Sequence, residues 1–293
     1  MKAFGEFHPA ALMMYFVGVV LVAMFTLHPV LLALALTGGI CFCALLEPAG
    51  RFVKDLGFYA GVFLLIAVTN PIFSHNGVTP LFFMNGNPVT LEAILCGLAV
   101  AGMLVAVMYW FKCYNHIMTS EKFLYLFGRA VPKLALVISM AMRFLPRFHS
   151  QMKRVSAAQK AMGLYAGKGL TDRARFGFRV LAATVTWSLE NAVDTADSMK
   201  ARGYGLPGRS SFSLFRFTGR DGGFLAVTGL LLASVLIGLI LGGGAFAFYP
   251  RVSFVSTAPL SLIVYFSYGV LCFAPFIIEL EESLRWKYLQ SRI

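Results

Sequence analysis

Residues 9 to 46 read PAALMMYFVGVVLVAMFTLHPVLLALALTGGICFCALL, a run without a single Lys, Arg, Asp or Glu. About 20 apolar residues in a helix span the hydrocarbon core of a bilayer, because each backbone group left unpaired in lipid costs several kcal/mol. The run is therefore long enough for two spans. A turn fits best at Leu27-His28-Pro29, since proline lacks the amide hydrogen that a helix needs. The sequence predicts spans at about 10–27 and 29–46.

Four more apolar stretches follow, at about 57–73, 91–111, 223–247 and 259–278. No Asp, Glu, Lys or Arg lies inside any of the six spans, and Glu92 sits at an end. Ion-driven carriers place ionisable groups at membrane depth, so this chain is not expected to couple transport to an ion gradient by itself. Gly57-x3-Gly61 and Gly238-x3-Gly242 permit close helix approach, but glycine is too common in membrane helices for either pair to predict a contact.

Composition and charge agree with this interpretation. The 293 residues are 58% hydrophobic and 13% charged, whereas an average soluble domain is about a quarter charged. The net charge of +12 is concentrated, because residues 112 to 220 hold 18 of the 25 Lys and Arg but only 5 of the 13 acids. One basic block inside a nearly neutral membrane body suits anionic lipid headgroups or an acidic protein partner, and it argues against nucleic acid.

Loop charges predict the topology. The link 47–56 carries Arg51 and Lys54, whereas the loop 74–90 has turn-forming pairs, Asn76-Gly77 and Asn85-Gly86, and no Lys or Arg. The positive-inside rule places both termini, the link and residues 112–222 in the cytoplasm, and the loop outside. We therefore expect an all-α integral protein of the cell (plasma) membrane with about six transmembrane helices. Its predicted parts are 1–111 with spans one to four, a basic cytoplasmic segment 112–222, and 223–293 with spans five and six.

The basic segment is predicted to be helical. A short helix begins at Thr119 or Ser120 and ends near 128–132, and a second runs over Lys133–Ala161. A third covers about Thr171–Ala201, with Glu190, Asp194 and Asp197 on one face. These helices are too apolar to be free in water and too charged to span, so we expect them at the membrane interface or packed under the bundle.

Catalytic chemistry is missing from the sequence. Gly163-x3-Gly167-Lys168-Gly169 has the wrong spacing for a phosphate-binding loop, and Gly203-x-Gly205-x2-Gly208 follows a helix instead of a strand. Neither the histidines nor the cysteines have metal or redox spacing, and we interpret them as packed or interfacial side chains. They are His8, His28, His75, His116 and His149, with Cys41, Cys43, Cys96, Cys113 and Cys272. No catalytic, cofactor or metal residue is predicted, so the chain is not expected to be an enzyme.

Two helix ends in the basic segment look alike. Ala158-Gln159-Lys160-Ala161-Met162-Gly163 closes the second helix, and Ser198-Met199-Lys200-Ala201-Arg202-Gly203 closes the third. Each ends in Lys-Ala-x-Gly. Together with the run from Pro132 to Pro146, these ends make the chain resemble the transmembrane T component (EcfT) of energy-coupling factor (ECF) transporters. The specific part of the resemblance is residues 130 to 205.

The resemblance implies a scaffold. In that family two coupling helices end in Ala-Arg-Gly-like motifs that dock on two ABC-type ATPases, and the same subunit holds a membrane-embedded substrate-binding S component for vitamin or metal-ion uptake. Ala201-Arg202-Gly203 matches the motif, whereas Ala161-Met162-Gly163 has methionine in place of arginine. Met162 would then pack in an apolar groove, with Lys160 or Arg154 supplying charge nearby. The implied ATPase-binding residues are Lys160, Ala161, Met162, Gly163, Ala201, Arg202 and Gly203.

Two alternatives remain open from the residues alone. In the first, Arg202 is only a cation that complements the dipole at a helix C-terminus, and Gly203 is an ordinary C-cap. The rival function is a lipid-modifying membrane enzyme whose basic segment binds headgroups. Its only candidate cluster is the Glu190, Asp194, Asp197 face, which lacks a partnering histidine. Co-purification with ATPases distinguishes the two functions.

Overall fold

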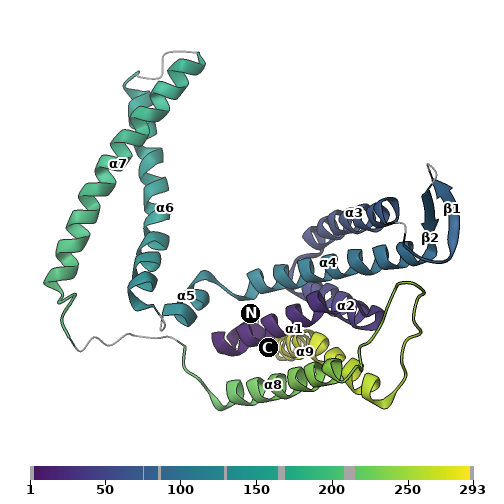
Figure 1. The fold of residues 1–293 in the computed structure, drawn as a ribbon. Coiled ribbons are helices and arrows are strands. Elements are labelled where there is room, and N and C mark those ends of the chain that lie inside the picture. The colour runs from purple at the N-terminus through teal and green to yellow at the C-terminus, as the bar shows by residue number, and fades with distance from the viewer. Residues whose placement is uncertain are drawn as a thin grey trace. The chain divides into compact units, whose positions relative to one another are not determined.

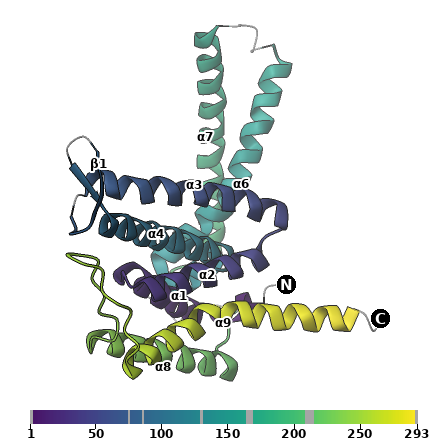
Figure 2. The same cartoon turned by 90° about the vertical axis from the view of Figure 1, so that its right-hand side faces the viewer.

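A computed structural model describes residues 3–74, 76–84, 87–128, 131–163, 169–207 and 215–290. Most of these residues are helical, which confirms the predicted fold class (Figures 1 and 2). Contacts divide the chain into two compact units. The first comprises Met1–Lys122 and Phe215–Ile293, and the second comprises Phe123–Leu214.

Apolar helices form most of the first unit. They are α1 (Pro9–Phe25), α2 (Pro29–Leu46), α3 (Ala49–Phe73), α4 (Leu91–Ile117), α8 (Gly219–Ile240) and α9 (Pro259–Gln290). All but α1 are long and apolar enough to cross a membrane, and α1 has 17 residues. Seventeen residues make a helix about 26 Å long, close to a hydrocarbon core of ~30 Å. The chain is therefore a multi-pass membrane protein, and the break between α1 and α2 lies at 26–28, one residue before the predicted Leu27-His28-Pro29.

The predicted polar link 47–56 is largely helical, because α3 already begins at Ala49 and includes Arg51 and Lys54. Long cationic side chains at a helix end can reach the headgroup region while the backbone stays helical, so charge alone does not end the helix. Helix α4 likewise continues past the predicted 111 to Ile117, and α9 runs past 278 to Gln290. Span five was predicted too long, since α8 stops at Ile240 before the run Gly242-Gly243-Gly244.

The predicted outer loop contains a β-hairpin that was not predicted, although an Asn-Gly pair such as Asn85-Gly86 is typical of hairpin turns. Strands β1 (Pro80–Met84) and β2 (Asn87–Thr90) pair antiparallel, with Phe83 opposite Pro88. The predicted turn at Asn85-Gly86 and His75 lie outside the described residues. Thr90 then caps α4 by accepting a hydrogen bond from the backbone N–H of Ala93.

Close helix contacts in the first unit depend on glycines other than the first predicted pair. A methyl group on Gly38 of α2 would lie 2.9 Å from the backbone oxygen of Cys272 in α9. A methyl group on Gly238 of α8 would overlap the side chain of Val264 in α9, whereas nothing lies within 4 Å of such a methyl on Gly57 or Gly61. The structure therefore assigns a packing role to Gly238 and none to the pair on α3.

One end of the first unit gathers the α1–α2 turn and the segment 241–258. His28 is buried there, and its Nε2 lies 2.9 Å from the hydroxyl of Tyr265. Ser74, which leads into the hairpin, lies 3.4 Å from the hydroxyl of Tyr249 by its Oγ. The loops between α1 and α2, α3 and α4, and α8 and α9 therefore lie on one side of the unit.

The second unit is a helical hairpin. It contains the rest of α5 (Ser120–Gly128), then α6 (Pro132–Ala161) and α7 (Leu170–Ala201), and α6 packs against α7. Phe144 and Trp187 stack with ring centroids 6.0 Å apart, while Val180 and Thr184 are buried. The three helices begin and end within two residues of the predicted bounds. Residues 164–168, which include the Lys168 of the rejected phosphate loop, lie outside the described part, as do 208–214.

Candidate functional site

Arg202 occupies the C-cap of α7. The N–H of Gly203 donates to the carbonyl of Lys200 at 2.9 Å, and the N–H of Tyr204 donates to the carbonyl of Met199 at 3.0 Å. This pair of bonds is a Schellman motif, in which the residue after the cap must adopt a positive φ. Gly203 has φ +84°, a conformation that glycine adopts at no cost. The motif ends the helix at a fixed point and leaves the Arg202 side chain exposed.

Met162 occupies the same position at the end of α6. Its N–H donates to the carbonyl of Ala158 at 3.1 Å, and the N–H of Gly163 donates to the carbonyl of Lys160 at 3.1 Å. Gly163 has φ +74°, and Met162 is 67% exposed. The two Lys-Ala-x-Gly stretches therefore share one backbone conformation as well as a sequence pattern. They differ in the side chain that the C-cap presents.

The two ends lie at opposite ends of the hairpin. Helices α6 and α7 run in opposite directions and cross at an angle, so that their C-termini point to opposite ends of the hairpin (Figure 1). The 32 residues of α7 measure about 48 Å at 1.5 Å per residue. Met162 and Arg202 are therefore too far apart to contact a single small site.

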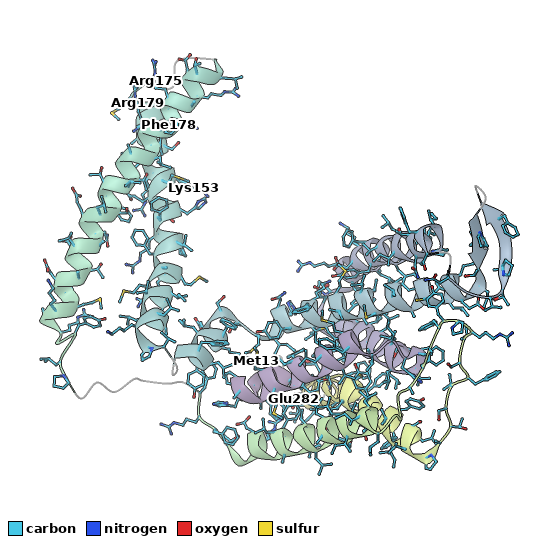
Figure 3. All side chains as sticks on the ribbon, viewed as in Figure 1. Met13, Lys153, Arg175, Phe178, Arg179 and Glu282 are labelled. Atoms are coloured by element: carbon cyan, nitrogen blue, oxygen red, sulfur yellow. The ribbon has the colours of Figure 1, made fainter. Side chains whose placement is uncertain are left out.

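The charges around the two ends differ. Lys153 on α6 and Arg175 and Arg179 on α7 are exposed near the Met162 end, beside Phe178, which is 74% exposed (Figure 3). Arg154 is exposed on the same half of α6. Three of the four acids of α7, Glu190, Asp194 and Asp197, lie toward its Arg202 end, where Lys200 and Asp197 form an exposed ion pair at 3.8 Å, whereas Asp172 lies in the first turn near the Met162 end. The Met162 end thus has a basic surrounding without an arginine at the cap.

The Glu190, Asp194 and Asp197 face is exposed on α7. Among the described residues, no group of three or more His, Cys, Asp or Glu side chains could hold a metal ion. The rival enzyme therefore gains no assembled site in this part of the chain. The cysteine interpretation holds for Cys43, Cys113 and Cys272, which are buried, while Cys41 and Cys96 are partly exposed.

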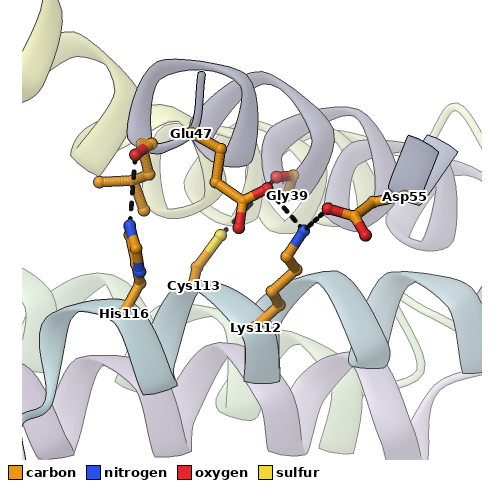
Figure 4. Close-up of polar contacts among 7 residues, drawn as sticks. Gly39, Glu47, Asp55, Lys112, Cys113 and His116 are labelled. Atoms are coloured by element: carbon orange, nitrogen blue, oxygen red, sulfur yellow. Dashed lines mark hydrogen bonds and ion pairs between the residues drawn. The ribbon is translucent and has the colours of Figure 1, made fainter. Parts of the chain in front are cut away.

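Sequence reasoning missed an ionic cluster in the first unit. Lys112 of α4 donates to Glu47 at 2.7 Å and to Asp55 of α3 at 2.5 Å (Figure 4). Nearby, His116 lies 3.3 Å from the carbonyl of Leu46. The cluster ties the α2–α3 link to α4. The positive-inside prediction had already put these residues on one side of the membrane, and that was the available signal.

Comparison with known proteins gives relatives of one kind. The chain is 35% identical over 108 residues to the energy-coupling factor transporter transmembrane protein EcfT of Lacticaseibacillus paracasei, covering 35% of this chain and 41% of that protein. It is 28% identical over 217 residues to EcfT of Lactobacillus helveticus, and this match covers 66% of this chain and 76% of that protein. It is 33% identical over 111 residues to EcfT of Exiguobacterium sibiricum, and this match covers 37% of this chain and 40% of that protein. No family model matches the chain.

The first and third of these matches span about two fifths of the length of the relatives, while the match to the Lactobacillus helveticus protein spans about three quarters. All three relatives carry the same description, and the fold is that of a helical multi-pass membrane protein. The resemblance of this chain to the transmembrane protein EcfT of energy-coupling factor transporters is therefore confirmed.

Proposed function

We propose that this chain is the membrane scaffold subunit of an ECF-type ABC importer. In this role it couples ATP hydrolysis by two partner ATPases to reorientation of a membrane-embedded S component that takes up a vitamin or a metal ion. The observation that carries the proposal is the pair of helix ends with one C-cap conformation at opposite ends of one helical hairpin. Similarity to EcfT proteins, over 66% of this chain for the Lactobacillus helveticus protein, supports it.

Two separated ends suit two ATPases. Each end offers a rigid helix terminus, one with Arg202 and one with Met162, and about 48 Å of helix keeps two partners apart. An arginine can hold a carboxylate through two parallel hydrogen bonds, which suits the transmission of force between subunits. The residues assigned to ATPase binding are Lys160, Ala161, Met162, Gly163, Ala201, Arg202 and Gly203.

The charge near Met162 replaces the missing arginine in this proposal. Arg175 and Arg179 lie in the N-terminal part of α7, and both side chains are exposed. This exposed positive charge favours an anionic partner, and Asp172 in the first turn of α7 offsets only part of it. We assign Met162 to an apolar groove of one ATPase, with Lys160 and Arg154 pairing with acids around it.

The proposal includes a topology and a division of labour. Segment 112–222 is the cytoplasmic coupling segment, lying at the inner membrane surface among anionic lipids, and 1–111 and 223–293 provide the membrane helices. Both termini are cytoplasmic. The chain itself has no catalytic role and needs no cofactor.

Purification tests the function directly. The chain tagged at its C-terminus and expressed with its genomic neighbours should bring down ATPase subunits in a detergent-stable complex. That complex should bind and hydrolyse ATP, whereas the chain purified alone should do neither. Nucleotide binding by the single chain, or purification without any ATPase, would count against the scaffold and favour the membrane enzyme.

A further inference from the structure

The chain crosses from the first unit to the second and back through two links. It leaves the first unit at Lys122, in the first turn of α5, and returns at Phe215, just before α8. Helices α4 and α5 are not continuous, because Met118 breaks the helical conformation with φ −83° and ψ 91°. A broken helix passes force poorly unless other contacts hold it. The contacts around the two links are therefore informative.

The N-terminal segment, residues 3–8, is anchored in the core of the first unit. It contains the 3-10 helix η1 (Ala3–Glu6), and Phe4 is fully buried. The ring of Phe4 lies 5.6 Å from that of Phe42 in α2 and 5.6 Å from that of Phe224 in α8. Its backbone N–H donates to the carboxylate of Glu279 in α9 at 3.1 Å. One short segment is thus fixed to three membrane helices.

Lys122 fastens the outgoing link to this segment. Its ammonium group donates to the backbone carbonyl of Gly5 and, at 3.1 Å, to the carbonyl of Ile117, the last residue of α4. The same side chain therefore bridges the break between α4 and α5 and ties it to the N-terminal segment. The negative end of the α4 dipole also stabilises a cation beside its last carbonyl groups.

Asp221 fastens the returning link. One carboxylate oxygen accepts a hydrogen bond from the N–H of His8 at 2.8 Å, and the other accepts from the N–H and hydroxyl of Thr218 at 2.9 and 2.6 Å. Asp221 is 5% exposed. Around it, Arg220 lies over the ring of Phe7 at 4.9 Å. The N-terminal segment thus holds both links through one charged side chain each.

We propose that residues 3–8 form a clamp that transmits movement of the coupling segment to the membrane helices, with Lys122 and Asp221 as its positioning residues. This inference rests on the proposed function. A single chain link carries force only in tension, whereas two links fixed to one buried segment turn a displacement of α6 and α7 into a displacement of α8 and α9. Charged hydrogen bonds at partly buried sites are strong enough for this because water competes less for them.

The test uses the complex purified with its ATPases and follows amide hydrogen exchange of α8 and α9 with and without Mg-ATP. Lys122→Met removes the contact of the outgoing link with Gly5, and Asp221→Ala removes the contact of the returning link with His8. Lys122→Arg restores a cation at position 122. Two controls separate the clamp from general stability. Thr218→Val removes the helix cap but leaves the bond from His8 to Asp221, and Lys54→Met removes an exposed cation of α3.

In the unaltered complex, ATP should change the exchange of α8 and α9. The two clamp variants should retain assembly and ATP hydrolysis while the ATP-dependent change falls about fivefold or more, the lower range of coupling between sites. The ATP-dependent change in exchange should persist in Lys122→Arg, Thr218→Val and Lys54→Met. No ATP effect in the unaltered complex, an unchanged effect in both clamp variants, or an equal loss in the controls would overturn the clamp.

The single chain gives an independent readout if no ATPase binds and the scaffold proposal fails. In the purified chain, Asp221→Ala should speed exchange of the His8 amide about tenfold, the change expected for one hydrogen bond to a charged group, while Thr218→Val should not. Unchanged exchange of this amide would show that the contact is not formed and overturn the clamp by itself.

Discussion

At the scale of single residues, Arg202 and Met162 are the sharpest test of the proposed site, because they share a backbone position and differ in chemistry. If Arg202 pairs with an ATPase carboxylate, Arg202→Ala leaves that carboxylate unpaired at a cost of about 2–5 kcal/mol. Met162→Ala removes only an apolar contact, and the loss of binding free energy is about 1–3 kcal/mol if Met162 is buried in a groove. ATPase retention on the tagged chain should therefore fall much more for Arg202→Ala, and Arg202→Lys should restore it in part.

The same pair of variants tests the simpler alternative. If Arg202 only complements the dipole of α7, its loss costs under about 1 kcal/mol, and Arg202→Ala and Met162→Ala should look alike. Equal and mild effects on ATPase retention and on uptake would return Arg202 to the role of a helix cap.

His28 gives a second residue-scale prediction, on pH. Burial lowers the pKa of His28, which is in the α1–α2 turn, and its Nε2 contacts the hydroxyl of Tyr265. Above the ordinary pKa of about 6.5 the side chain is neutral in both states, so its contribution to stability is complete there. As the pH falls below this value, the unfolded chain takes up a proton that the folded chain resists, and stability decreases.

Thermal unfolding in detergent measures this effect. The melting temperature should drop between pH 7.5 and acidic pH, and His28→Gln should flatten the profile, whereas His149→Gln, which alters an exposed histidine, should leave it unchanged. A profile that is the same in His28→Gln and in the unaltered chain would assign the acid sensitivity to other groups.

At the scale of helices, glycine contacts predict which pairs of spans are packed most closely. Gly38→Ala places a methyl group 2.9 Å from the backbone oxygen of Cys272, so α2 and α9 must separate, at a cost of about 1–3 kcal/mol. Gly61→Ala meets nothing within 4 Å and should be neutral or gain up to about 1 kcal/mol from helix propensity. The mid-point of thermal unfolding in one detergent measures both, and equal effects would contradict the packing.

The helices show what the sequence could and could not predict. Hydropathy located all six apolar helices, because crossing lipid requires long apolar runs, and Gly163 and Gly203 located the ends of α6 and α7, because a positive φ favours glycine. Hydropathy misplaced the start of α3, since Arg51 and Lys54 are tolerated in a helix end. Hydropathy also missed the hairpin. It missed the clamp because the pairing of Asp221 with His8 joins residues more than 200 positions apart. The basic surroundings of Met162 depend on how α6 and α7 pack, which no single stretch specifies.

At the scale of the whole molecule, the first unit has two chemically different ends. The hairpin, the α1–α2 turn and the segment 241–258 lie at one end, where Arg251 is the single Lys or Arg among the described residues. The N-terminal segment, the α2–α3 link and the links to the coupling segment lie at the other. Cations on that side are Arg51, Lys54, Lys112, Lys122, Arg216, Arg220 and Arg285. This distribution supports a cytoplasmic location for the second end under the positive-inside rule.

Cysteine labelling in intact cells tests that topology. In a background without the five native cysteines, Val78→Cys in the α3–α4 loop and Phe254→Cys in the 241–258 segment should react with a membrane-impermeant maleimide, because both side chains are exposed at the proposed outer end. Leu170→Cys, which is 83% exposed at the start of α7, should react only after the membrane is permeabilised. Phe254 is 97% exposed, so it is the closest match in exposure to Leu170 and serves as its control. Labelling of Leu170→Cys in intact cells would place the coupling segment outside, where no cytoplasmic ATPase could reach Arg202, and the scaffold proposal would fail with the topology.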